Sequence, residues 1–146
     1  MITQNLQWNS GVLKVGLSKT VQKTITEAQT LVFGRGALKE LLATPSLTAL
    51  MIEAAISTVD PVLPEGYVTI GKSSSVSYQN PTMIGMTVTV TAALAEIDKN
   101  RLVFEITAFD ELGQIARGKH ERIIVDAAAF MQKANRRCDP VKNILK

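Results

Sequence analysis

The stretch ATPSLTALMIEAAISTVDP, residues 43–61, decides the fold of this chain. Thr44 is a good residue to cap the start of a helix, and Pro45 suits the first helical position, where its missing N–H costs nothing. The Asp-Pro pair at 60–61 ends the helix, because the residue before a proline is pushed out of the helical region. We therefore predict a helix that ends at Val59.

The predicted helix is apolar on nearly every side, and Glu53 is its only charged residue. A helix that is apolar all round is expected to be buried rather than to lie on a surface. The turn signal Pro-Glu-Gly at 64–66 follows it, and the chain beyond alternates apolar and polar residues in the manner of strands. The helix is therefore expected to pack against a sheet.

Five strands are expected in all. One precedes the helix, in the β-branched segment 17–32, and short turns such as Lys99-Asn100 join those after it. The later strands are predicted at 67–80, 87–97, 101–111 and 114–126. Short helices are predicted at 37–43, after the breaker FGRG at 33–36, and at 127–137. The fold class is α+β, an antiparallel sheet of about five strands wrapped round one long apolar helix. Such a sheet cannot cover its second face alone, so we expect a homodimer.

The basic residues gather at the C-terminus. Of 16 Lys+Arg and 13 Asp+Glu, five basic residues and one acidic residue lie in 133–146, a net charge of +4, and the rest of the chain carries −1. The 146 residues therefore divide into a lead-in over 1–14, one domain over 15–132 and a basic tail over 133–146. A near-neutral body with 5% aromatic residues argues against a nucleic-acid partner. Such a tail is most often solvated, and a contact with a partner protein stays open.

Several classes of protein are excluded by what the chain lacks. It has no GxSxG, P-loop, GxGxxG or HExxH motif, and its one histidine and one cysteine are too few for a zinc site. The single Cys138 cannot form an internal disulfide, which favours a reducing compartment. No export signal and no run of 18 apolar residues occur. We expect a soluble, cytoplasmic protein without a membrane partner, a metal or another cofactor.

His120 and Glu53 are the first candidates for chemistry. His120 is the only histidine, so a Ser-His-Asp or Cys-His mechanism would have to use it. A histidine of a sheet that hydrogen-bonds its neighbours is the commoner case. A lone carboxylate on an apolar helix must be solvated, paired or used, and burial would raise its pKa toward that of a general base. A salt bridge from Glu53 to an arginine such as Arg122, or exposure at the sheet edge, is the alternative.

Thr44 and Tyr78 are the remaining polar candidates. Capping of the helix explains Thr44 about as well as a functional role does. Tyr78 shares the predicted inner face of its strand with Val68, Ile70 and Val76. A core tyrosine with a satisfied hydroxyl is commoner there than an acid.

Five motifs together resemble one family. They are VGLSKTVQKTITEAQT (15–30), ATPSLTALMIEAA (43–55), LPEGYVTIG (63–71), IGMTVTVTAAL (84–94) and GKHERIIVDAAAF (118–130). In this order and spacing they resemble the fluoroacetyl-CoA thioesterase-like family of the hot-dog thioesterase superfamily. The resemblance implies a hot-dog fold that hydrolyses an acyl-CoA thioester without metal. It also implies a site at the dimer interface near the start of the central helix, where a Thr, a Glu and a His act beside a Gly and an Arg.

The site residues that this resemblance implies are only partly present. Thr44 matches the threonine, and Gly71 and Arg122 match the glycine and the arginine, which are expected to bind substrate. The family's glutamate falls on Ile52 and its histidine on Tyr78. Isoleucine cannot accept a proton, and tyrosine, with a reference pKa of about 10, is a poor base at neutral pH. Its hydroxyl can still donate a hydrogen bond to a thioester carbonyl.

Three functions stay open at this point. We expect hydrolysis of a small or medium acyl-CoA, in which Thr44 orients the thioester or a water, Tyr78 donates a hydrogen bond and Glu53 is the base from an altered helix phase. The first alternative is a non-catalytic dimer that binds an acyl-CoA or another small ligand, because the Glu and His positions hold Ile52 and Tyr78. The second is an interaction protein that makes contact through its basic tail. Pairing of dimers into a tetramer also stays open.

Overall fold

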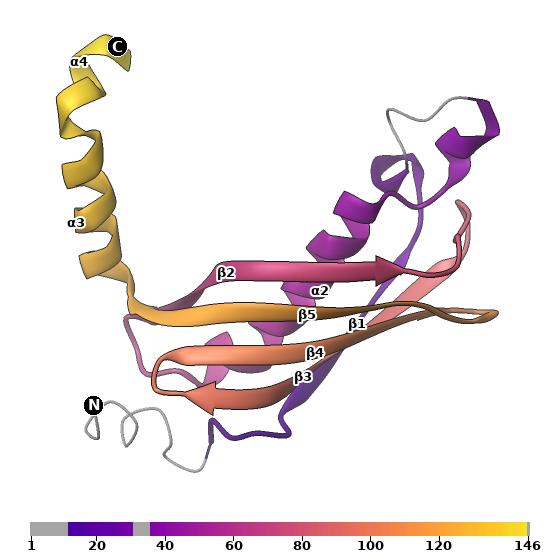
Figure 1. The fold of residues 1–146 in the computed structure, drawn as a ribbon, viewed down its shortest axis with the longest axis horizontal. Helices are drawn as coiled ribbons and strands as arrows, with labels where there is room; N and C mark the ends of the chain where they lie inside the picture. Colours follow the sequence, from indigo (N-terminus) through magenta and orange to yellow (C-terminus); the bar gives the residue numbers. More distant parts are fainter. Residues whose placement is uncertain (1–11, 31–35, 146) are drawn as a thin grey trace.

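One antiparallel sheet and one long helix make up the body of the protein in the computed structural model, which describes residues 12–30 and 36–145. The strands are β1 (Ser18–Thr24), β2 (Tyr67–Tyr78), β3 (Thr87–Asp98), β4 (Arg101–Asp110) and β5 (Gly113–Asp126). Their order across the sheet is β1-β3-β4-β5-β2, so β1 and β2 are the edges. Helix α2 (Thr44–Val59) lies against one face (Figure 1). The predicted α+β class is confirmed.

The core lies between α2 and the sheet. The helix contributes buried residues at the spacing of one helical face, namely Leu47, Leu50, Met51, Ala54, Ala55, Thr58 and Val59. Alternate residues of the central strands meet them, such as Val88 and Val90 of β3 and Phe104 and Ile106 of β4. Gly118 of β5 permits a close approach of its neighbours, because a Cβ there would lie 2.8 Å from the Ser75 carbonyl oxygen and 3.1 Å from the Met51 Sδ.

The hairpins after β2 follow the sequence closely. Asp98 pairs with Arg101 across the turn at Lys99-Asn100, and Lys99 has a φ of 57°, the left-handed conformation that a tight turn requires. Gly113, with a φ of 134°, opens β5 directly after the next turn. The predicted turn at Lys99-Asn100 is therefore confirmed, and the next turn lies at residues 111–112.

The first strand is shorter than predicted. It ends at Thr24, and a 3₁₀ turn (Glu27–Gln29) follows instead of the strand expected as far as residue 32, of which 31–32 lie outside the described residues. Thr26 and Gln29 cause the break by capping this turn: the Gln29 side chain accepts a hydrogen bond from the Thr26 N–H at 2.9 Å, and the Thr26 hydroxyl accepts one from the Ala28 N–H at 3.3 Å. The short helix predicted at 37–43 is a 3₁₀ turn (Gly36–Glu40), after which Leu41 and Leu42 make isolated bridges.

Two expectations about α2 are wrong. Ala43, not Thr44, is the N-cap, and no side chain caps the helix. The helix is also not buried all round. At 100° per residue, a strip of half-buried or exposed side chains runs along the face that points away from the sheet: Pro45, Ala49, Ile52, Glu53 and Ile56. Sequence alone suggested full burial because the strip is apolar apart from Glu53.

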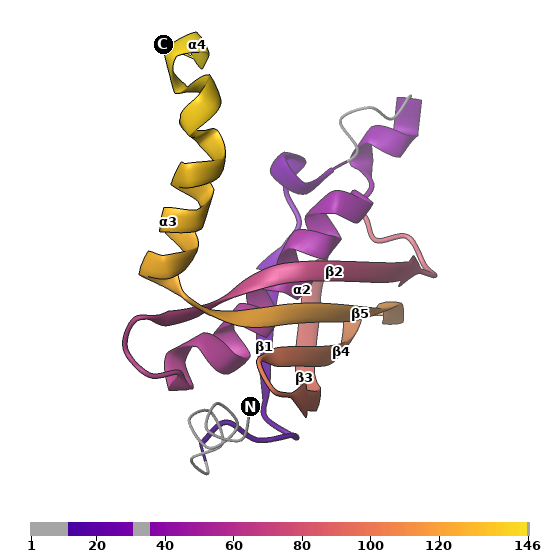
Figure 2. The ribbon, with the colours of Figure 1, turned by 60° about the vertical axis from the view of Figure 1, so that its left-hand side comes forward.

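A C-terminal arm, α3 (Ala127–Cys138) to α4 (Lys142–Leu145), extends from the end of β5, with a 3₁₀ turn (Asp139–Val141) between its helices. It projects past the β2 edge of the sheet, away from the body (Figures 1 and 2). No residue of α3 is buried. Within the described ranges, no helix is long and apolar enough to cross a membrane.

Candidate functional site

A hollow of about 350 Å³ lies where the start of α2 meets the end of β2. Its lining consists of Leu41, Leu42, Thr44, Tyr78, Gln79, Asn80 and Pro81. Two of the three predicted catalytic residues, Thr44 and Tyr78, therefore line one cavity although they are far apart in the sequence. The lining contains no carboxylate, imidazole or cationic side chain.

The start of α2 supplies unused hydrogen-bond donors to this hollow. Because Ala43 is the N-cap and cannot cap with its side chain, the N–H groups of Thr44 and Ser46 have no partner among the described residues. The Thr44 hydroxyl likewise has no hydrogen bond there and is exposed. The positive end of the helix dipole adds to these donors. The site thus favours negative charge that develops on a bound oxygen.

Tyr78 is a hydrogen-bond donor rather than a base. Its Oη accepts a hydrogen bond from the Thr82 N–H at 3.3 Å, and a phenol that accepts one hydrogen bond still has its own O–H as a donor. Burial is the largest influence on the Tyr78 pKa and raises it above 10.0, against the opposing hydrogen bonds with Thr82. The phenol is therefore neutral at physiological pH. Thr82 is itself fixed by a 2.8 Å bond from its Oγ1 to Asp110.

A β-bulge sets the direction in which Tyr78 points. Gly71 pairs with Arg122 and Ser73 with Glu121, so Lys72 is the extra residue of β2. The bulge exchanges the two faces of the strand, and as a result Thr69 is buried and Val68 is 38% exposed. Placing Val68 on the same inner face as Tyr78 is therefore wrong. Period-two alternation cannot show a bulge that only the pairing with β5 reveals.

A chain of buried hydrogen bonds runs beneath the bulge. Asp60 accepts from the Thr69 N–H and hydroxyl, the latter at 2.5 Å. Arg122 donates through Nε to the Thr69 hydroxyl at 2.6 Å and through Nη2 to the Thr69 carbonyl at 2.8 Å. Its Nη1 lies 3.1 Å from Nε2 of His120. Arg122 is only 4% exposed, and burial lowers its pKa although Asp60 opposes the shift.

Of the two residues predicted to bind substrate, Arg122 lies in this buried chain and Gly71 is an exposed residue beside it, and neither lines the hollow. Gly71 stands beside Arg122, where an added Cβ would lie 3.5 Å from Nη1 of the guanidinium. Sequence reasoning missed Asp60 and Thr69 as partners of Arg122. In the sequence, Asp60 is recognisable only as part of the Asp-Pro pair that ends the helix. No sequence pattern indicates that it lies near Arg122, 62 positions later.

His120 is a buried histidine that hydrogen-bonds its neighbours, as the commoner interpretation predicts. Its Nδ1 lies 2.9 Å from the Ser73 carbonyl and therefore carries the proton, so that Nε2 can accept from Arg122. The side chain is 2% exposed. Burial and, to a smaller extent, the charge of Arg122 lower the His120 pKa below 6.5, against the effect of the Ser73 carbonyl.

The pH dependence of stability tests this neutral histidine. An unfolded histidine gains its proton near pH 6.5, whereas the native one resists until a lower pH. Between these two values the unfolded state binds more protons, so the free energy of unfolding falls as the pH falls. We expect thermal denaturation between pH 7.5 and 5.5 to show this loss. His120→Gln should show a clearly smaller loss over that range, because His120 is the only histidine. Equal slopes in the two proteins would contradict the assignment.

Glu53 does not line the hollow. It is exposed on α2, nine residues after Thr44, which corresponds to about 13 Å along the helix and the opposite side of it. The suggested salt bridge to Arg122 is wrong, because the bonds of Arg122 go to Thr69 and His120 and, in the described ranges, no ion pair includes Glu53. Ile52 is half-buried on the same exposed strip.

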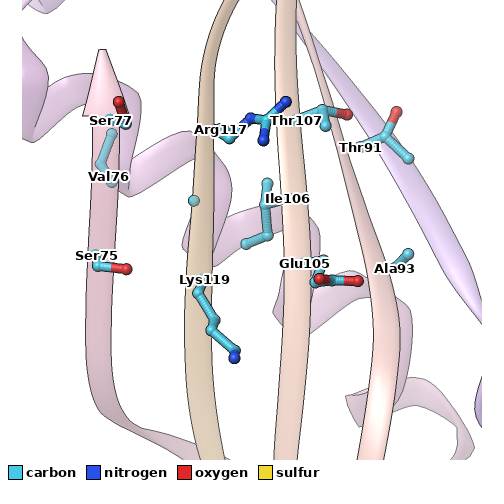
Figure 3. A pocket seen from close by; sticks show the side chains of 11 residues that line it. Ser75, Val76, Ser77, Thr91, Ala93, Glu105, Ile106, Thr107, Arg117 and Lys119 are labelled. Carbon is cyan, nitrogen blue, oxygen red and sulfur yellow. The ribbon is translucent and has the colours of Figure 1, made fainter.

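A second, larger hollow of about 610 Å³ lies on the outer face of the sheet (Figure 3). Short polar side chains of β2, β3 and β4 meet there with Glu105, Arg117 and Lys119, which come from neighbouring strands. The sheet separates it from α2, and none of the predicted site residues lines it. In the described part of the chain, no group of three potential metal ligands occurs.

Comparisons with known proteins agree on one family. Residues 25–128 match the family model for the fluoroacetyl-CoA-specific thioesterase, FlK. The fluoroacetyl-CoA thioesterase of Streptantibioticus cattleyicolor is 32% identical over 98 residues, which cover 67% of this chain and 70% of that one. A hot-dog-like protein from Thermanaerovibrio acidaminovorans has 28% identity and a TM-score of 0.82, over 88% of this chain and 95% of its own.

A point mutant of FlK, solved in complex with fluoroacetate and CoA, is also similar. It has 27% identity and a TM-score of 0.74, over 81% of this chain and 99% of its own. These structures confirm the hot-dog fold that the five sequence motifs imply.

Proposed function

This chain belongs to the fluoroacetyl-CoA-specific thioesterase family, and from that premise we propose that it hydrolyses the thioester of a small or medium acyl-CoA. One observation carries the proposal. The uncapped start of α2, the Thr44 hydroxyl and the Tyr78 hydroxyl supply hydrogen-bond donors around one small hollow. A thioester carbonyl bound there gains most from these donors when it becomes a tetrahedral oxyanion.

The proposed reaction needs a water and no further reactant. The water oxygen adds to the thioester carbon, and the carbonyl becomes an oxyanion that Tyr78 and the donors of Thr44 stabilise. The C–S bond then breaks, and the products are the free acid and the CoA thiol. The hollow of about 350 Å³ suits a short acyl chain better than a long one.

A homodimer completes the proposed site. Strand β2 is an edge of 12 residues and has no strand on its outer side among the described residues. Long open edges are the usual places where a second chain pairs. The exposed strip of α2 is apolar apart from Glu53, and an exposed apolar surface of this kind is typical of an interface with another chain. We therefore propose that two copies pair at β2, and that they act in the cytoplasm.

The proposed base is Glu53 of the second copy. In its own chain it points away from the side of α2 on which Thr44 lies, so one chain cannot bring both to the same thioester. We propose that the Glu53 carboxylate of one copy accepts the proton of the attacking water in the other copy's site. Glu53→Gln should then lower kcat and leave KM nearly unchanged. An unchanged kcat would remove Glu53 from the reaction.

A binding protein without catalysis is the second candidate. It is favoured by one observation, namely that no side chain lining the hollow can act as a base. Release of CoA from acetyl-, fluoroacetyl-, butyryl- and hexanoyl-CoA, followed with a thiol reagent, decides between the two. Turnover above background supports hydrolysis. Binding of a non-hydrolysable CoA analogue in calorimetry, without turnover on any of these substrates, supports the binding protein.

Tyr78→Phe tests whether the Tyr78 hydroxyl stabilises the oxyanion or only helps to bind the substrate. The substitution removes one donor and keeps the ring, so we expect kcat to fall about tenfold or more with little change in KM. Tyr67→Phe, on the same strand but at its other end, is the matched control and should change kcat by less than about twofold. Loss of binding rather than of kcat in Tyr78→Phe would contradict its assignment as a donor to the oxyanion.

A further inference from the structure

The C-terminal arm, residues 127–145, carries exposed basic side chains on one flank. Lys133, Arg136 and Arg137 are all exposed and lie within about 100° of each other around α3. In the described residues none of the three has an ion-pair partner, whereas Lys142 pairs with Asp139 at 2.9 Å. The flank is therefore free to bind an anion.

The basic part of the arm lies outside the part of the chain that the family model matches. The family match ends at residue 128, so Lys133, Arg136 and Arg137 lie beyond it. Helix α3 starts at the end of β5, and Asp126, its N-cap, pairs with Tyr67 at the start of β2. The position of the arm is thus fixed by the sheet although none of α3 is buried.

Within one chain the arm cannot reach the hollow at Thr44 and Tyr78. The arm stands at the start of β2 and the hollow at its end, and a strand of 12 residues is about 36 Å long. Figures 1 and 2 show the arm and the start of α2 at opposite ends of β2, both extending beyond the β2 edge of the sheet.

Pairing of two copies at β2 removes this separation. Two identical edge strands related by a two-fold axis perpendicular to the sheet run antiparallel, so the start of one β2 lies beside the end of the other. The arm already extends past that edge. The arm of each copy therefore stands beside the hollow of the other copy.

We propose that Lys133, Arg136 and Arg137 of one subunit bind the phosphate groups of the CoA whose thioester lies in the hollow of the other subunit. This inference rests on the proposed function and names the part of the substrate that the hollow does not hold. The hollow has no cationic side chain, yet the nucleotide end of CoA carries several negative charges that need cations. Arginine matches phosphate oxygens through paired N–H donors, and lysine adds a point charge.

Comparison of two substrates tests the phosphate contact. We expect the triple variant Lys133→Ala, Arg136→Ala, Arg137→Ala to raise KM for an acyl-CoA about tenfold at unchanged kcat, and to lessen the rise of KM with salt. Its KM for the matching acyl-pantetheine, which lacks the phosphates, should stay the same. The control Lys19→Ala, Lys23→Ala removes two exposed lysines from the opposite edge strand and should change neither value. Circular dichroism checks that α3 stays helical.

Mixed dimers test whether the arm acts across subunits. One copy carries Thr44→Val with an intact arm, and the other carries the three alanines with an intact Thr44. If the arm serves the other subunit, the mixed dimer has one complete site and shows the wild-type KM at about half the wild-type kcat. If the arm serves its own subunit, the mixed dimer keeps the raised KM.

Each remaining outcome also decides the question. An unchanged KM for acyl-CoA in the triple variant overturns the inference, as does an equal rise for acyl-pantetheine or a monomer in light scattering. Loss of binding to vesicles of anionic lipid with an unchanged KM would make the arm a membrane contact instead. If no acyl-CoA is hydrolysed, the proposed function fails separately. Calorimetry with CoA then tests the arm, and a tenfold weaker Kd for the triple variant upholds it.

Discussion

Thr44→Val is expected to lower kcat/KM for acyl-CoA hydrolysis about 100-fold. Valine has nearly the shape of threonine, so the helix and the hollow should remain while one hydrogen-bond donor is lost. Donors aimed at a developing oxyanion contribute about 10²–10³ in rate when the site is otherwise intact. Because the Thr44 hydroxyl has no other hydrogen bond in the described residues, its loss should cost little stability. Steady-state kinetics and thermal denaturation of the same preparation separate the two effects.

Thr48→Val is the matched control, one turn further along α2. The Thr48 hydroxyl donates to the Thr44 carbonyl at 3.0 Å and does not line the hollow. Its replacement should change kcat/KM by less than about threefold. Equal losses in both variants would mean that valine disturbs the start of α2 generally, and would remove the assigned role of the Thr44 hydroxyl.

Gly118→Ala is expected to lower the free energy of unfolding by about 2 kcal/mol, because it overfills a close contact of β5 with the backbone of β2 and with Met51 of α2. The new Cβ would lie 2.8 Å from the Ser75 carbonyl oxygen and 3.1 Å from Met51 Sδ. The methionine can move, but the carbonyl belongs to the backbone of β2. For a chain of this size the change corresponds to a fall in Tm of about 5 °C.

Gly71→Ala is the control for that loss. A Cβ at Gly71 would meet Arg122 and His120 at 3.5 and 3.7 Å, which are ordinary contacts, and its backbone is not in the left-handed region. We expect a change within about 0.5 kcal/mol, since alanine also restricts the unfolded chain. Denaturant unfolding of the two variants side by side gives the comparison. A Gly71→Ala variant as unstable as Gly118→Ala would contradict the assigned contact at Gly118.

The sequence predicts this fold well wherever local chemistry decides the structure. The end of α2 at the Asp-Pro pair, the turn at Lys99-Asn100 and the regular alternation of β3 all depend on neighbouring residues, and all are observed. The N-cap of α2 is an exception, because the sequence predicts Thr44 and the structure has Ala43, one residue earlier. Thr44 is chemically the better cap, but the chain places it inside the first turn.

The candidate site is less predictable, because it depends on contacts between distant residues. Thr44 and Tyr78 line one hollow only because β2 ends beside the start of α2. The partners of Arg122 could not be found from sequence, since Thr69 turns inward only through the bulge at Lys72. The prediction that α2 is buried on all sides failed for a different reason. Sequence hydrophobicity does not distinguish a residue covered by its own chain from an apolar residue that its own chain leaves exposed.

The bulge at Lys72 also bears on how many chains can assemble. A straight, uninterrupted edge accepts a new strand and then presents the same edge again, which leads to open-ended fibres. Here the edge strand bends at Lys72, in the middle of its 12 residues, and its two halves present opposite faces. Two copies related by a two-fold axis can pair along such an irregular edge, and the pairing leaves no free β2 edge for a third copy. The irregularity therefore favours a closed pair over a growing ribbon, and it protects the chain against aggregation while its edge is still open.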